Sequence, residues 1–83
     1  MNEDLRQVLD ILDELQEDGA VSKNIKQKVL GIKKDLTSCS GDEISLRVNK
    51  TLSELEDISG DVNLPMFVRT QIWQLTSILE KLS

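Results

Sequence analysis

The chain has 83 residues, of which 39% are hydrophobic and 30% are charged, and its formal net charge is −5. A chain of this length buries only about 60–65% of the surface that it exposes when unfolded, which allows one modest core and no second domain. No apolar run approaches the roughly 20 residues of a membrane-spanning helix, and the acidic residues 1–4 do not resemble a secretory signal. A single cysteine cannot form an internal disulfide, which is typical of a reducing compartment. We therefore expect one soluble cytoplasmic domain over residues 1–83.

The first amphipathic stretch predicts a helix over residues 3–16. Its apolar residues recur at helical spacing and form one stripe, Leu5, Val8, Leu9, Leu12 and Leu15. Ile11 lies beside this stripe and would widen it toward a neighbouring helix. Asp18 and Gly19 end the helix.

A second helix is predicted to begin after Ser22, a favourable N-cap residue, and to run to about residue 38. Its stripe is Ile25, Val29, Ile32 and Leu36, with Leu30 to one side. Gly31 lies inside this helix, where it marks either the close approach of another helix or a tolerated surface glycine.

Small polar residues interrupt the helical pattern over 37–41. Ser40 and Glu43 then have the spacing of a capping box, in which each side chain accepts a hydrogen bond from the backbone N–H of the other residue. The third helix is expected over 42–58, with five residues facing inward: Ile44, Val48, Thr51, Leu52 and Leu55.

The fourth helix has the most regular pattern of the four. Its apolar residues alternate steps of four and three along Val68, Ile72, Leu75, Leu79 and Leu82. Asn63 or Leu64 is expected to cap it, with Pro65 in the first turn, where a missing N–H does no harm. Four helices with short connections predict an all-α fold, an antiparallel four-helix bundle.

The sequence also contains a repeat. Residues 13–18 (Asp-Glu-Leu-Gln-Glu-Asp) correspond to 53–58 (Ser-Glu-Leu-Glu-Asp-Ile), an offset of 40, whereas residues 21–26 correspond to 64–69, an offset of 43. The bundle should therefore consist of two similar helical hairpins that bury their apolar stripes against each other. The change of offset predicts that the loop of the second hairpin is three residues longer.

Charge is unevenly distributed along the chain, with −6 over residues 1–18 and +4 over residues 19–38. This favours pairing of the acidic first helix with the basic second helix, although exposed ion pairs contribute only about 0.2–1 kcal/mol each. A second interpretation makes the lysines a basic patch for nucleic acid or ribonucleoprotein, namely Lys23, Lys26, Lys28, Lys33 and Lys34. Nucleic acid is the less favoured partner, because the chain is acidic overall and has few aromatic residues.

No catalytic, cofactor or metal site is expected from the residue types. The chain has no histidine and no tyrosine, which removes the commonest general acid–base group and metal ligand. Four carboxylates share one face of the first helix and could hold Mg²⁺, although a solvated outer face explains them as well: Asp10, Asp13, Glu14 and Glu17. Cys39 has no histidine to activate it as a nucleophile. We therefore expect a protein that is not an enzyme.

The best functional lead is a set of apolar residues outside the stripes. Trp73 and Leu30 occupy matching positions of the two hairpins, and Met66 and Arg69 precede Trp73 by seven and four residues. In one interpretation these residues fill the core, with Arg69 covering the indole of Trp73. In the other, Met66, Phe67 and Trp73 form an exposed cluster that binds a protein partner or a second copy, with Arg69 and Leu30 beside it. Tryptophan and arginine are enriched at interface anchors, so the sequence predicts an interaction module.

Residues 56–66 (Glu-Asp-Ile-Ser-Gly-Asp-Val-Asn-Leu-Pro-Met) and 68–73 (Val-Arg-Thr-Gln-Ile-Trp) resemble a family of short archaeal proteins, the uncharacterised protein family number one hundred and forty-seven. Residues 42–47 also fit the start of the family's third helix. The resemblance covers essentially the whole chain and implies a small all-helical protein of an archaeal cytoplasm, but it supplies no functional residues. The chain departs from the family pattern at residues 21–27, Val-Ser-Lys-Asn-Ile-Lys-Gln, where the family usually shows Val-Pro-Arg-Asn-Ile-Arg-Arg.

Overall fold

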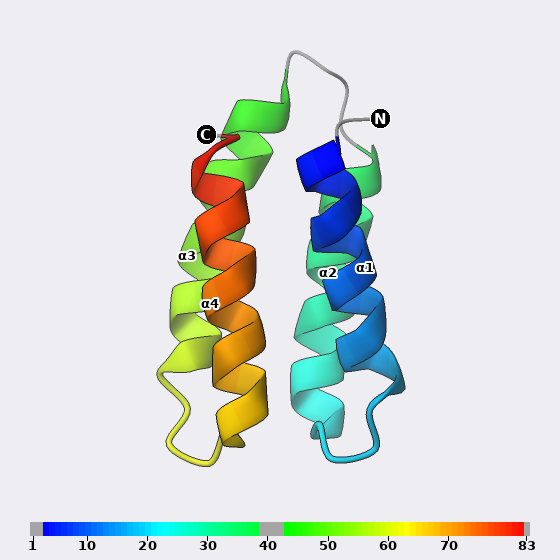
Figure 1. The fold of residues 1–83 in the computed structure, drawn as a ribbon, viewed down its shortest axis with the longest axis vertical. Helices are drawn as coiled ribbons and strands as arrows, with labels where there is room; N and C mark the ends of the chain where they lie inside the picture. The colour runs from blue at the N-terminus through cyan, green and yellow to red at the C-terminus, as the bar shows by residue number, and fades with distance from the viewer. Residues whose placement is uncertain (1–2, 39–42, 83) are drawn as a thin grey trace.

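The computed structural model describes residues 3–38 and 43–82. These residues form four α-helices, Glu3–Glu17 (α1), Lys23–Ser38 (α2), Ile44–Ser59 (α3) and Met66–Glu80 (α4), which are labelled in Figure 1. None of the described residues lies in a β-strand. The predicted all-α fold is confirmed, and the helix bounds lie within two residues of those expected.

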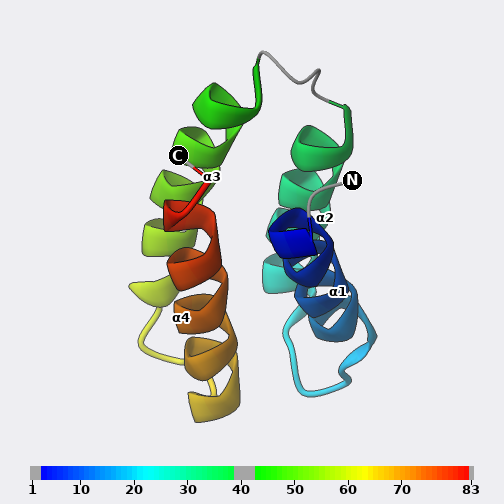
Figure 2. The same cartoon turned by 45° about the horizontal axis from the view of Figure 1, so that its top comes forward.

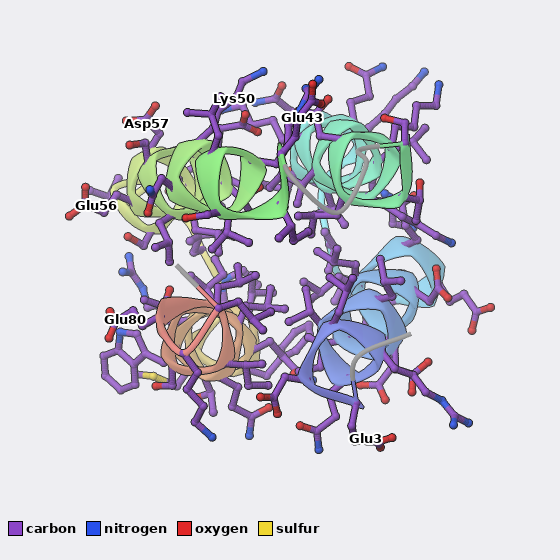
Figure 3. The ribbon with its side chains drawn as sticks, turned by 90° about the horizontal axis from the view of Figure 1, so that it is seen from above. Glu3, Glu43, Lys50, Glu56, Asp57 and Glu80 are labelled. Carbon is purple, nitrogen blue, oxygen red and sulfur yellow. The ribbon has the colours of Figure 1, made fainter. Side chains whose placement is uncertain are left out.

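The helices form an antiparallel bundle in which each helix contacts two neighbours. α1 and α3 both contact α2 and α4, whereas among the described residues no Cα atoms of the diagonal pairs α1–α3 and α2–α4 come within 8 Å of each other. Figure 2 shows the α1–α2 hairpin standing beside the α3–α4 hairpin, and the view along the bundle in Figure 3 shows the four helices at the corners of a square. The bundle of two hairpins that the sequence predicts is therefore confirmed, and it measures 36 × 21 × 18 Å.

One apolar core fills the centre of the square, and all four helices contribute to it. The apolar residues predicted to face inward from α2 are all buried, and so are the first four of those predicted for α4, Val68, Ile72, Leu75 and Leu79. Thr51 of α3 is also buried, and its hydroxyl donates a hydrogen bond to the carbonyl oxygen of Arg47 (2.9 Å). Ile58, which the sequence analysis did not place in the core, is buried there.

The two hairpins close with the same turn. In the first loop the backbone N–H of Ala20 donates to Asp18 Oδ1 (2.8 Å), and in the second the N–H of Asn63 donates to Asp61 Oδ1 (2.9 Å). The carbonyl oxygen of each aspartate also accepts the N–H of the residue three positions later, at 3.2 and 3.3 Å. An aspartate favours such a turn because its carboxylate binds the backbone two residues on.

The loop of the second hairpin is one residue longer than that of the first, so the predicted difference of three residues is wrong. The loops occupy residues 18–22 and 60–65. Most of the three residues that the second hairpin has in excess of the first lie in α3, not in the loop. α3 continues to Ser59 and so places the apolar Ile58 in the core. The corresponding position of α1 is Asp18, a turn residue, so α1 ends earlier.

The start of α2 follows the prediction, whereas the start of α4 does not. Ser22 Oγ accepts a hydrogen bond from the N–H of Ile25 (3.2 Å), as an N-cap side chain should. α4 is capped by Pro65 in an extended conformation (φ −60°, ψ 150°), and not by either of the two residues before it. A proline fits there because the N–H of an N-cap residue takes no part in the helical hydrogen bonds. The predicted capping-box residue Ser40 lies outside the described residues.

Candidate functional site

An uncharged stripe runs along the outer face of α4, opposite the core. We call Met66, Thr70, Trp73 and Ser77 the α4 stripe, because steps of three and four residues place them on one side of the helix. Met66 is 73% exposed and Trp73 is 68% exposed. The interpretation in which Trp73 fills the core is therefore wrong, and the indole lies at the surface. Binding of a partner there stays a prediction.

The structure separates the other members of the predicted partner surface. Phe67 is partly exposed beside the stripe, whereas Leu30 lies on α2, diagonally across the bundle from α4. The guanidinium of Arg69 donates hydrogen bonds to the carbonyl oxygens of Ser59 (3.0 Å) and Asp61 (2.8 Å). These bonds connect α4 to the end of α3 and to the loop between the two helices. Arg69 therefore supports the fold, whereas the core interpretation expected it to cover the indole.

A groove of about 650 Å³ lies between α1 and α4, beside the α4 stripe. The partly buried Ile11 and Ile78 give it an apolar base, and Trp73 lines its α4 side. Asp10 and Glu14 line its α1 side. We call this feature the α1–α4 groove.

The charge of the α1–α4 groove is entirely negative. Among the described residues that line it, Asp10 and Glu14 are the only charged ones, and both are exposed. A hydrogen bond from Gln71 Nε2 to Glu14 Oε2 (3.3 Å) links the two walls. Within the described residues, no salt bridge involves either carboxylate.

Ion pairs connect α2 to both of its neighbouring helices, α1 and α3. Lys33 of α2 pairs with Asp13 of α1. Asp35 of α2 pairs with Arg47 (3.7 Å) and Lys50 (3.4 Å) of α3. The acidic wall of the α1–α4 groove has no such cationic neighbour on α4.

The structure distributes the five lysines of the predicted basic patch around α2. Lys33 faces α1, where its partner lies, and Lys26, seven residues earlier, shares that side. Lys28 lies on the α3 side, in a hollow lined also by acidic residues of α3. Only Lys23 and Lys34 lie on the outer face of the helix, where both are exposed. Nucleic-acid binding through α2 stays a prediction.

The carboxylates considered for Mg²⁺ point to different parts of the surface. Asp13 pairs with Lys33, whereas Asp10 and Glu14 line the α1–α4 groove. Across residues 3–38 and 43–82, no three His, Cys, Asp or Glu side chains are grouped as a metal site requires. Cys39 lies outside this part of the chain. No helix in the same ranges is long and apolar enough to cross a membrane.

Sequence reasoning missed the α1–α4 groove, because its two walls are distant in the chain and no local pattern identifies neighbouring helices. Two signals were nevertheless present. Ile11 and Ile78 lie beside the buried stripes of their helices, and the outer face of α4 carries little charge. Together these signals indicate that another helix partly covers the Ile78 side of α4, while the outer face of α4 stays exposed.

The fold and its surface define the class of protein, a small four-helix bundle of two similar helical hairpins. The groove between α1 and α4 has an acidic wall on one side and an exposed tryptophan on the other. Residues 1–82 match the model of the uncharacterised protein family UPF0147, and the chain belongs to this family. The resemblance inferred from residues 56–73 is therefore confirmed.

Relatives in this family come from several archaea. The UPF0147 protein of Archaeoglobus fulgidus is 48% identical over 79 residues, which cover 95% of this chain and 88% of the relative. That of Methanosarcina acetivorans is 42% identical over 76 residues, covering 92% and 77%. The crystal structure of MMP1188, a protein of unknown function, matches with a TM-score of 0.87 at 33% identity, over 98% of this chain and 91% of that chain.

Proposed function

We propose that this protein is a non-enzymatic, cytoplasmic interaction module that binds a protein, either a partner or a second copy, through the α4 stripe. The observation that carries the proposal is the exposure of Met66 and Trp73, at 73% and 68%, on one helix face that carries no charge from Met66 to Ser77. Single exposed apolar side chains are common on soluble proteins. Two such side chains seven residues apart form a continuous surface that a partner can cover.

Burial of this surface supplies part of the energy that a specific contact needs. Complete burial of one large apolar side chain contributes about 1.5–3 kcal/mol, so that Met66 and Trp73 together supply roughly 3–6 kcal/mol before the cost of association. Tryptophan is also among the residues that most often dominate binding energy at interfaces. The missing histidine and tyrosine, together with the separation of the carboxylates, support a binding role in preference to a catalytic one.

The test compares two double variants that remove similar amounts of exposed apolar surface. Met66→Ser/Trp73→Ser changes the α4 stripe, and Leu46→Ser/Val62→Ser changes two other exposed side chains, 72% and 87% accessible. Sedimentation velocity across a concentration series measures self-association. Quantitative co-purification from an extract of the source cells measures binding to other proteins.

We expect the α4 variant to lose self-association or partner recovery by about tenfold or more, and the control variant to retain it within about twofold, because roughly 1.4 kcal/mol of lost contact energy gives a tenfold change. Equal loss in both variants would show that apolar surface in general, and not the α4 stripe, causes the binding. A wild-type protein that stays monomeric and recovers no partner would overturn the proposal.

A further inference from the structure

We infer that the α1–α4 groove binds a basic, amphipathic helical segment of a partner protein. This inference rests on the proposed function, and it adds the position, shape and charge of the partner. The groove overlaps the α4 stripe, since Thr70, Trp73 and Ser77 belong to both.

The shape of the groove suits about two turns of helix. Its lining extends from Gln7 to Glu14 on α1 and from Thr70 to Ile78 on α4, which at 1.5 Å per residue is about 10–12 Å along the bundle. Apolar residues of a partner helix at positions i, i+3 and i+4 would meet Ile11 and Ile78 at the base of the groove. Peptide recognition by a hydrophobic groove commonly uses this spacing.

The charge of the groove selects a cationic partner. Asp10 and Glu14 lie on one wall, and no lysine or arginine lines the groove. At the α2 boundaries, by contrast, acidic side chains have lysine or arginine partners from the neighbouring helix. A lysine or arginine of a bound helix would supply the missing cation, and complementary potentials of this kind determine which partners associate.

The indole strengthens the preference for a cation. Trp73 is 68% exposed and shares the groove with the two carboxylates. Lysine and arginine bind the faces of aromatic rings, and tryptophan is the strongest of these acceptors. A second cationic side chain of a bound helix could therefore contact the indole, on the other side of the groove from the carboxylates.

A second copy of this chain is a poor occupant. Its own basic helix is α2, which lies diagonally opposite α4. Insertion of α2 from one copy into the groove of another is therefore a head-to-tail contact that does not close on itself, and such contacts extend into open chains. Each copy also carries a net charge of −5, so that copies repel one another.

The experiment uses the full chain and a synthetic helical peptide of leucine and lysine, about 14 residues and roughly 21 Å long. Trp73 is the single tryptophan and lines the α4 side of the groove, so its fluorescence reports on that side. We expect a saturable blue shift of the emission with the basic peptide, and no shift with a peptide in which glutamate replaces every lysine. Light scattering on the same samples detects any association of copies.

Matched variants separate the groove from the total charge of the protein. Asp10→Asn/Glu14→Gln and Glu56→Gln/Asp57→Asn remove the same charge from exposed positions, the first pair in the groove and the second on α3. Figure 3 shows Glu56 and Asp57 on the outer side of α3, away from α1. We expect the groove variant to weaken peptide binding by about tenfold and the α3 variant by less than about twofold, because the screened effect of distant charges is small.

Equal weakening by the two variants, or binding without a fluorescence change, would overturn the inference. The inference would also be overturned if light scattering showed that the wild-type protein self-associates and that a second copy displaces the peptide from the groove. The proposed function fails separately, when Met66→Ser/Trp73→Ser leaves self-association and partner recovery unchanged. A failed peptide titration beside a successful α4-stripe test would therefore reject only the basic helix.

Discussion

Replacing Arg69 by methionine tests whether this residue supports the fold. Methionine keeps most of the aliphatic length but removes two hydrogen bonds, to the carbonyl oxygens of Ser59 (3.0 Å) and Asp61 (2.8 Å). A hydrogen bond from a charged donor contributes about 1.5–3 kcal/mol when the acceptor stays dry. Both bonds are only partly buried and water can reach the freed carbonyl oxygens, so about 1 kcal/mol each, or roughly 2 kcal/mol in total, is the expected loss. For a domain of this size that corresponds to a fall in Tm of about 8–16 °C.

The repeat supplies the control. Lys26 occupies the position of Arg69 in the first hairpin, and its amino group forms no salt bridge with any described residue. Lys26→Met should therefore change the free energy of unfolding by less than about 0.5 kcal/mol. Urea and thermal denaturation followed by circular dichroism measure both variants. Equal midpoints for the two methionine variants would refute the assignment of Arg69 as a structural residue.

Three further substitutions test the core and one helix surface by the same denaturation measurements. Gly31→Ala should raise the free energy of unfolding by about 0.5–1 kcal/mol, because a Cβ at that position meets no atom within 4 Å; a decrease would indicate a close helix contact. Thr51→Val should be neutral or stabilising by up to about 1 kcal/mol, since the backbone N–H of residue 51 still bonds the carbonyl of Arg47 in the helix; a clear loss would show that the buried hydroxyl is required. Leu75→Ala should cost about 2–5 kcal/mol, because Leu75 is 0% exposed in the core; a loss below about 1 kcal/mol is incompatible with tight packing there.

The buried stripes of α2 and α4 could be predicted because each has one apolar residue per turn on a narrow face. α1 is less clear, since Leu9 and Ile11 lie on opposite edges of its apolar face, separated by about 160° around the helix. Two neighbouring helices cannot fully cover a face that wide, so both residues are only partly buried. The sequence shows which residues are apolar at helical spacing, but the neighbouring helices determine how far around the helix burial extends.

The position of Trp73 was available from helix geometry. Residue 73 lies about 100° from Ile72 and about 160° from Leu75 around the helix, on the side away from the core. The core interpretation needed an apolar face of the fourth helix broad enough to include residue 73, and this angle excludes it. The structural role of Arg69 could not have been predicted in the same way. One of its acceptors is the carbonyl oxygen of Asp61, which lies in the loop after α3, and helix periodicity does not predict where a loop carbonyl points.

The two hairpins differ most where the fold constrains them least. Lys23 and Lys34 on the outer face of α2 correspond, at the offset of 43, to Met66 and Ser77 on α4. Neither pair reaches the core, so lysine at both positions of α4 would serve the bundle as well as it does in α2. A charged face also keeps a small protein soluble and monomeric, whereas an exposed apolar face costs solubility. Packing therefore explains the likeness of the two hairpins but not the replacement of these two lysines by Met66 and Ser77, and the proposed contact with another molecule would supply a physical reason for it.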